Sequence, residues 1–232
     1  LKSPKFFLYR NEPWASSTLS DNFILSFTED DKGNLWIGSN KGLDKYDHQL
    51  IKYINYKIPH NNPMASEGFV YALHSDGSGN LWIGTFGGGL ILFDINKEKI
   101  IKQFLFDPKN PNGIIDNRVT TIFEDENGDY LIGTVAGICR FNKSEKTFKH
   151  YLLSSEDSSE LSERWISKII KDSDKNFWVG TTAGLFRVDT NGEVKRYIYD
   201  LNDEGSISNS IISSLYEDEN KNIWVGTDDG IN

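Results

Sequence analysis

The sequence is short of cysteine, of basic charge and of long apolar runs. Its 232 residues include a single cysteine, Cys139, so an internal disulfide and a thiolate metal cluster are both excluded. Acidic residues outnumber basic ones by 34 to 25, which disfavours nucleic acid and anionic membrane surfaces as partners, because both need a basic face. No apolar run approaches the roughly 18–20 residues of a membrane span. With a hydrophobic content of 38%, the chain is expected to be globular.

A short element rich in aromatic and aliphatic residues recurs along the chain. "NLWIG" occurs at 34–38 and again at 80–84, and weaker copies follow: "DYLIG" (129–133), "NFWVG" (176–180) and "NIWVG" (222–226). The glycines that close these elements lie 46 to 49 residues apart. Because a catalytic element would normally occur once, five copies at a nearly fixed period indicate a repeat architecture.

Each repeat predicts four antiparallel strands. An apolar segment such as "FVYALHSD" (69–76) is followed by an Asp-led turn, by the "LWIG" strand, whose glycine is expected to end it, and by two further strands. In the first strand, Val70 and Leu73 are apolar, as are their equivalents in the other copies. Since side chains alternate along a strand, these two positions are expected on opposite faces. The strands are therefore predicted to lie between two neighbouring sheets.

Four-stranded sheets with two apolar faces bury them by stacking around an axis, which predicts an all-β fold, a β-propeller of four-stranded antiparallel blades. The predicted units are 1–22 (the end of a preceding blade), 23–68, 69–117, 118–164, 165–210 and 211–232 (an incomplete blade). About five repeats are present, so we expect a fragment of a larger propeller of about seven blades. Its free edges are expected to be covered by a second chain, in a dimer.

Tryptophan marks the second strand in four of the five copies. Trp36, Trp82, Trp178 and Trp224 are therefore expected to be buried between blades at equivalent positions. The third copy has Leu131 in this place, which changes the packing volume there. Trp165 is expected to differ, lying near the channel mouth and being partly accessible.

The repeats resemble those of a known family. "EDENKNIWVGTDDGI" (217–231) and "EDDKGNLWIGSNKGLDKYD" (29–47) are similar to the two-component regulator propeller repeat. The resemblance implies the periplasmic sensor half of a hybrid two-component histidine kinase, in which paired propellers precede an immunoglobulin-like domain and a membrane helix. It also implies a non-enzymatic domain that responds to oligosaccharides and signals by phosphorelay to genes for polysaccharide utilisation. Contact with the membrane would then be made only by other parts of the protein.

Candidate ligand-binding residues lie where the copies differ, in the loops between blades and between the second and third strands, which share one end of each blade. They are Phe69, Phe86, Arg118, Arg164, Trp165, Asp228 and Asp229. Aromatic rings can stack on sugars, and Arg or Asp can bond hydroxyl groups. No catalytic residue, metal ligand or cofactor is predicted. The Asp-led turns fit turn chemistry better than a calcium loop, and Cys139, within "GICRF", is typical of a small core residue.

Two other functions stay open on the sequence. One is an enzymatic propeller, such as a lyase resembling the streptogramin-inactivating group, and the other is a pure protein-interaction scaffold. An enzyme should show His and Glu residues that occur once and converge at a channel mouth. The residues that do not repeat are mostly aromatic, Asn and Ser, which favours binding.

Overall fold

The computed structural model describes residues 6–15, 17–60, 68–151 and 165–232. The chain divides into two compact units, residues 1–102 and 103–232. Throughout the described part, the regular elements are β-strands, and all the pairings are antiparallel. None of these residues forms a helix long and apolar enough to cross a bilayer. The predicted all-β class is confirmed.

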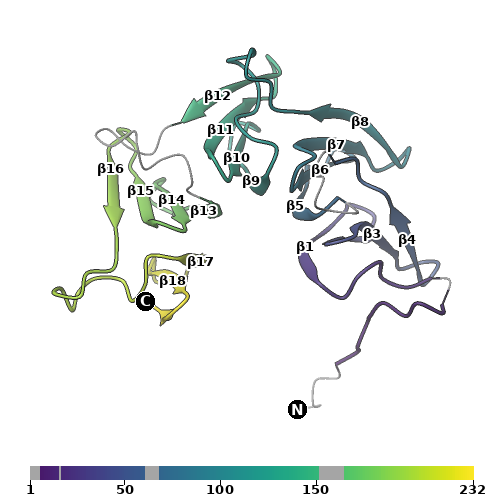
Figure 1. Ribbon diagram of the computed structural model, residues 1–232, viewed down its shortest axis with the longest axis horizontal. Helices are drawn as coiled ribbons and strands as arrows, with labels where there is room; N and C mark the ends of the chain where they lie inside the picture. Colours follow the sequence, from purple (N-terminus) through teal and green to yellow (C-terminus); the bar gives the residue numbers. More distant parts are fainter. Residues whose placement is uncertain (1–5, 16, 61–67, 152–164) are drawn as a thin grey trace. The chain divides into compact units, whose positions relative to one another are not determined.

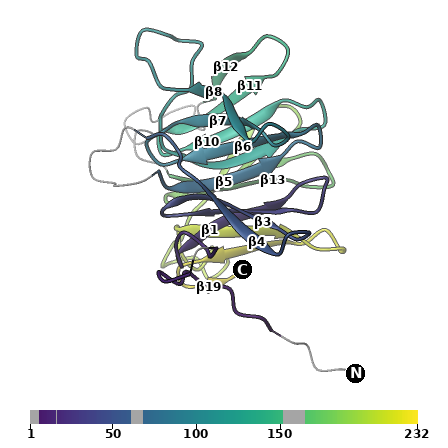
Figure 2. The same cartoon turned by 90° about the vertical axis from the view of Figure 1, so that its right-hand side faces the viewer.

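The first unit holds two four-stranded sheets, each in sequence order (Figure 1). The first sheet is β1 (Ile24–Glu29), β2 (Leu35–Ser39), β3 (Gly42–Asp47) and β4 (Lys52–Tyr56). The second sheet is β5 (Val70–Ser75), β6 (Asn80–Thr85), β7 (Leu90–Asp94) and β8 (Lys99–Phe104), whose last residues cross the unit boundary. β1 and β2 pack against β5, and Figure 2 shows β1 and β5 one above the other.

The second unit holds the other three sheets. The third sheet is β9 (Val119–Glu124), β10 (Tyr130–Thr134), β11 (Gly137–Asn142) and β12 (Thr147–Tyr151). The fourth sheet is β13 (Ile166–Lys171), β14 (Phe177–Thr181), β15 (Gly184–Val188) and β16 (Val194–Tyr197). The fifth sheet is β17 (Ile212–Glu217), β18 (Ile223–Thr227) and β19 (Gly230–Ile231). β13 packs on β9 and β10, and β17 packs on β13 and β14, so successive sheets stack as propeller blades do.

The expectation that the two apolar positions of the first strand face opposite ways is wrong. Val70 lies opposite Thr85 on β6, and Leu73 lies opposite Ile83, two residues earlier on that strand. Directly paired residues point to the same side, so Val70 and Leu73 share a face. The cause is a β-bulge, which adds one residue and shifts the alternation. The register shift recurs in all five first strands, at Leu25, Tyr71, Thr120, Ser167 and Ser213.

Burial on both faces nevertheless holds for the fourth sheet, through a different pair of residues. Ile169 faces the third sheet, in a cluster with Ile138. Its neighbour Ile170 faces the other way and packs with Ile212 and Leu215 of the fifth sheet. The predicted stacking is therefore correct, although the residues that produce it were misassigned.

The motif glycine has a different role from the one expected. It does not end the strand, since β2 continues one residue beyond Gly38. A Cβ at Gly38 would lie 2.6 Å from Val70 Cγ1, and one at Gly180 would lie 2.7 Å from Ile212 Cγ2. The glycine thus makes room for the first strand of the following sheet.

The predicted burial of the motif tryptophans is confirmed for Trp36 and Trp82 and is wrong for Trp224, which is 43% exposed. Trp178 is half-buried. The physical reason is that no other described sheet of the second unit packs on the outer face of β18. Phe27 on β1 is likewise 72% exposed. Coverage of such faces by a second chain stays a prediction.

Candidate functional site

The predicted loop end is built the same way in every sheet. The residue just before the first strand accepts a backbone hydrogen bond from the turn between the second and third strands. Phe86 N donates to Phe69 O at 2.9 Å, and Thr182 N donates to Trp165 O at 3.2 Å. The same bond joins Asn40 to Phe23, Val135 to Arg118 and Asp228 to Ile211. The inference that these two loops share one end of each sheet is therefore confirmed.

In the first unit this end carries three aromatic rings. The rings of Phe69 and Phe86 are 6.5 Å apart, and that of Tyr71 lies 5.4 Å from Phe86. All three are half-buried, and burial raises the pKa of the Tyr71 hydroxyl, which keeps it neutral. Sequence reasoning missed Tyr71 because simple alternation does not foresee the bulge at which it stands. We call Phe69, Tyr71 and Phe86 the aromatic cluster.

The turn beside the aromatic cluster consists of three consecutive glycines, Gly87 to Gly89. Gly87 and Gly89 have φ values of +109° and +70°, which favour glycine. A Cβ at Gly88 would collide with the carbonyl oxygen of Pro59, so this turn lies against the connection that leaves the first sheet. Gly88 N donates to Thr85 Oγ1 at 2.9 Å.

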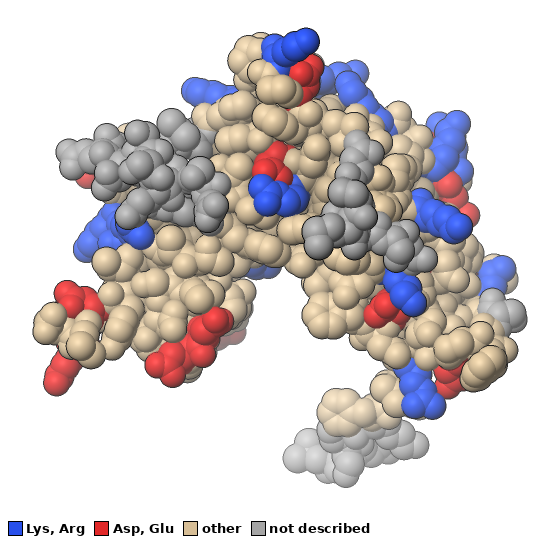
Figure 3. Space-filling view, viewed as in Figure 1, with Lys and Arg blue, Asp and Glu red and all other residues tan. Residues whose placement is uncertain are grey.

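In the second unit the predicted residues are less concentrated. Arg118 is held by Asp116, with Nε and Nη2 donating to the two carboxylate oxygens at 2.9 and 2.6 Å. Trp165 is half-buried, as expected, whereas Asp228 and Asp229 are exposed. Arg164 lies outside the described residues. On the face drawn in Figure 3, charges of both signs are interspersed and uncharged residues cover most of each unit.

The Asp-led turn connects to the motif tryptophan at the opposite end of the sheet. Asp30 Oδ1 accepts from the backbone nitrogens of Lys32 and Asn34, and Oδ2 accepts from Trp36 Nε1 at 2.9 Å. Burial works against the Asp30 carboxylate, but the bonds from Asn34 and Trp36 outweigh it and hold its pKa below the usual value.

The same Asp-to-Trp bond recurs in the fourth and fifth sheets, at 2.7 Å for Trp178 and 2.9 Å for Trp224. Its signal was present in the sequence as the pattern Asp-x-x-x-Asn-x-Trp. The carboxylates serve the turn and the indole, which is the structural role that the sequence indicated. Among the described residues, no group of three or more His, Cys, Asp or Glu could hold a metal ion.

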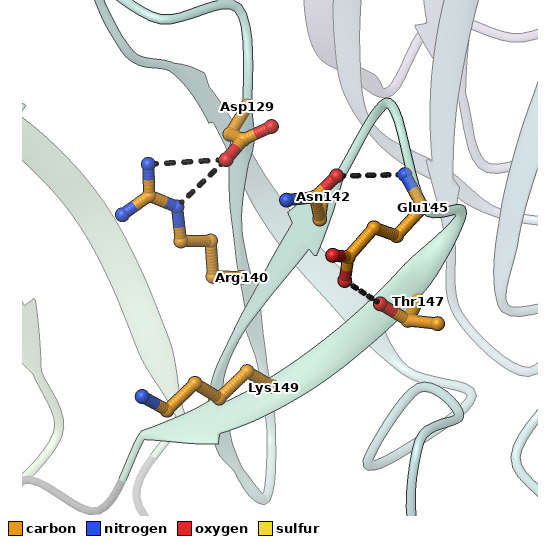
Figure 4. Close-up of a pocket in the computed structure, with 6 residues that line it drawn as sticks. All are labelled: Asp129, Arg140, Asn142, Glu145, Thr147 and Lys149. Atoms are coloured by element: carbon orange, nitrogen blue, oxygen red, sulfur yellow. Dashed lines mark hydrogen bonds and ion pairs between the residues drawn. The ribbon is translucent and has the colours of Figure 1, made fainter.

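The third sheet departs from this arrangement and forms a polar pocket of about 360 Å³. Arg140 donates from Nε to Asp129 Oδ2 at 3.1 Å, and Lys149 lines the same pocket (Figure 4). Glu145 closes it, accepting from Thr147 Oγ1 at 3.4 Å. Arg140 and Asp129 already bond each other, so the aromatic cluster is the better candidate for a ligand site.

Cys139 is fully buried on β11. Burial raises the pKa of its thiol to about 12, so the nucleophilic thiolate is not formed near neutral pH. The interpretation of Cys139 as a core residue is confirmed.

Stacked antiparallel sheets, each made from one sequence repeat, define the chain as a β-propeller protein. The family model described as two component regulator propeller matches residues 18–41, 65–87, 113–136 and 205–229. Four segments of the chain thus match the two-component regulator propeller repeat. The repeat around Trp178 lies outside the matched segments, although its sheet has the same Asp-to-Trp bond.

Solved structures agree with this family. The extracellular domain of the hybrid two component system BT3049 from B. thetaiotaomicron is 25% identical, with a TM-score of 0.76. The match covers 97% of this chain and 28% of that one, so the chain spans less than a third of its relative. A search of curated proteins gave no match.

Two further structures show likeness of fold alone. PorZ, a surface component of the type-IX secretion system of Porphyromonas gingivalis, is 18% identical with a TM-score of 0.66, over 95% of this chain and 33% of that one. An inactive virginiamycin B lyase from Staphylococcus aureus, solved with quinupristin, is 14% identical with a TM-score of 0.65, over 93% of this chain and 71% of that one.

Proposed function

We propose that the chain is a non-enzymatic, periplasmic part of the sensor of a hybrid two-component histidine kinase. It binds oligosaccharides, and the full protein signals by phosphorelay to genes for polysaccharide utilisation. The observation that carries this proposal is the repeat match together with the 25% identity, over 97% of the chain, to an extracellular domain of a hybrid two component system.

The aromatic cluster supports a sugar as the ligand class. Sugar rings present flat C–H faces that pack on aromatic side chains, and Phe69, Tyr71 and Phe86 are grouped and half-buried.

The direct test is a glycan array with the purified chain, followed by calorimetry with the glycan that binds. Phe86→Ala should weaken binding roughly tenfold or more, because it removes the central ring of the aromatic cluster. Phe27→Ala is the matched control, since it removes an exposed ring on β1 and should leave affinity unchanged. Absence of binding to any glycan, or equal affinity of the Phe86→Ala variant, would contradict the proposal.

A lyase is the second candidate, because the fold likeness to virginiamycin B lyase covers 93% of this chain. We expect no turnover. Incubation with quinupristin and chromatography of the products tests this directly. Cleavage by the wild-type chain that is lost on mutation of an acidic or His residue would overturn the non-enzymatic assignment.

A further inference from the structure

A second pocket of about 360 Å³ lies between the third and fourth sheets, within the second unit. Its walls are mainly apolar, and a few charged side chains converge on it. The residues used below are Leu131, Phe177, Val188, Asp125, Arg140 and Asp189. The volume is in the range of small-molecule sites, which begins at about 300 Å³.

The corresponding space between the first and second sheets is filled by aromatic rings. Trp36 is fully buried there, 5.5 Å from the ring of Phe93 and 5.6 Å from that of Tyr56. By position in the repeat, Leu131 takes the place of Trp36, and Val188 takes that of Phe93. Both replacements are smaller, whereas Phe177 is larger than its counterpart Leu81, so the pocket is part of the space that a tryptophan occupies elsewhere in the chain.

The cation that faces the tryptophan ring elsewhere is retained in the pocket. Lys45 Nζ lies 5.7 Å from the centre of the Trp36 ring, and the Arg187 guanidinium lies 5.8 Å from that of Trp178. In the third sheet Arg140 stands in this position, paired with Leu131 across the strands. An aromatic ring in the pocket would therefore meet a guanidinium placed for a cation–π contact.

The acceptor for the ring N–H is also retained. Asp125 occupies the position of Asp30, and its Oδ2 accepts from Arg140 Nη2 at 2.7 Å. Asp30 Oδ2 accepts two donors, Trp36 Nε1 and Asn34 Nδ2. Since a carboxylate oxygen can accept two hydrogen bonds, Asp125 Oδ2 can accept a ring N–H in addition to Arg140.

We propose that this pocket binds a small aromatic molecule with a ring N–H, of the size of indole, in the position of the absent tryptophan side chain. The ring lies against Phe177 and Val188 and donates to Asp125. Two carboxylates, Asp125 and Asp189, and one base, Arg140, surround the pocket. This balance of charge favours a neutral or cationic ligand over an anionic one.

The first test is methyl NMR of the wild-type chain titrated with indole. The methyl signals of Leu131 and Val188 should shift and saturate with a Kd of about 1 mM or tighter, the scale that a small ligand reaches. Tryptamine should bind at least as well, and indole-3-acetate roughly tenfold or more weakly. No shift at these methyl groups would overturn the proposal, as would equal binding of the anion.

The second test fills the pocket. Leu131→Trp should abolish indole binding and raise the Tm, since it restores the side chain found in the other sheets. Leu201→Trp is the matched control, because Leu201 is 82% exposed in the same unit, and it should bind as the wild type does. If Leu131→Trp does not fold, Val188→Phe fills the same space from the fourth sheet. Indole binding that survives in a folded filling variant would contradict the proposal.

The third test creates the pocket elsewhere. Trp178→Leu removes the equivalent ring between the fourth and fifth sheets while Asp172 and Arg187 stay in place. Calorimetry should then show two indole sites in place of one. An unchanged single site would contradict the idea that the retained Asp and base define the ligand. These outcomes do not depend on whether the aromatic cluster binds glycans.

Discussion

Trp36 and Trp224 occupy the same position in the first and fifth sheets and make the same hydrogen bond. In each, Nε1 donates to the turn aspartate at 2.9 Å. Trp36 is nevertheless fully buried, whereas Trp224 is 43% exposed. The bond therefore belongs to the hairpin, and burial is supplied by the following sheet. The repeat motif thus specifies a local turn first and a core only where another sheet packs on it.

Leu131 adds a third case to this comparison. There the following sheet is present, but the side chain that fills the space is smaller, and a pocket results. Trp36, Leu131 and Trp224 together separate two contributions of the tryptophan side chain to the fold. One is its hydrogen bond to the turn, and the other is the volume that it fills between sheets.

The largest expected effect is a difference between two truncations. Trp36→Ala should lower the free energy of unfolding by about 3–5 kcal/mol, because it opens a cavity between sheets. Trp224→Ala should cost about 1 kcal/mol, mainly the lost hydrogen bond. Urea unfolding of both variants measures this. If both variants lost the same free energy of unfolding, the difference in burial between Trp36 and Trp224 would not determine their contributions to stability.

The motif glycines offer the same contrast with smaller effects. Gly180→Ala places a Cβ 2.7 Å from Ile212 Cγ2, and such overpacking should cost about 1–3 kcal/mol. At Gly226 the nearest atom is the hydroxyl of Ser214, which can rotate away. Gly226→Ala should therefore change stability by less than about 0.5 kcal/mol. Thermal unfolding of the two variants measures both losses of stability. A greater loss of stability for Gly226→Ala than for Gly180→Ala would contradict the prediction.

The turn conformation predicts a stabilising change. In the Asp-led turns, the fourth residue counted from the aspartate has a positive φ. It is Gly33 (+79°) in the first sheet and Lys175 (+70°) in the fourth. A side chain there costs about 1–2 kcal/mol, so Lys175→Gly should recover about 1 kcal/mol. Lys175→Ala, which removes the charge but keeps Cβ, should give no gain. A gain with alanine equal to that with glycine would show that charge, not backbone strain, is responsible.

The smallest effect is electrostatic. Hydrogen bonds from Asn222 and Trp224 lower the pKa of Asp218 to about 2. Because the folded-state pKa is below the ordinary value of about 3.9, the stabilisation is fully present above that pH and is lost as the pH falls toward 2. Carboxyl NMR should show this titration, and Trp224→Phe should raise the pKa of Asp218. An unchanged pKa in that variant would show that the indole N–H contributes nothing.

Much of the fold could be predicted from the sequence. The period, the Asp-led turns and the four segments per repeat gave the strands and their order, because these are local signals. The faces could not be assigned, since the bulge at Tyr71 and its equivalents leaves no mark in an apolar segment. The exposure of Trp224 was also missed, because it depends on which neighbours are present and not on the motif.

The candidate site was predictable only in part. Phe69 and Phe86 could be proposed because they vary between otherwise similar copies at one end of the sheet. Tyr71 was missed because of the bulge. The pocket at Leu131 was missed for another reason. The replacement of tryptophan by Leu131 was visible in the sequence. The second replacement, Val188 in the position that Phe93 has in the second sheet, matters only because the two sheets face each other, which the structure shows.

The central claim is that the tryptophan position is a space defined by two neighbouring sheets, whether or not a tryptophan fills it. The most direct measurement is a crystal structure of the chain grown with indole. The account predicts a planar ring between the third and fourth sheets, with its nitrogen within hydrogen-bonding distance of Asp125 Oδ2. A pocket closed by side chains, or indole bound only at the aromatic cluster, would contradict it.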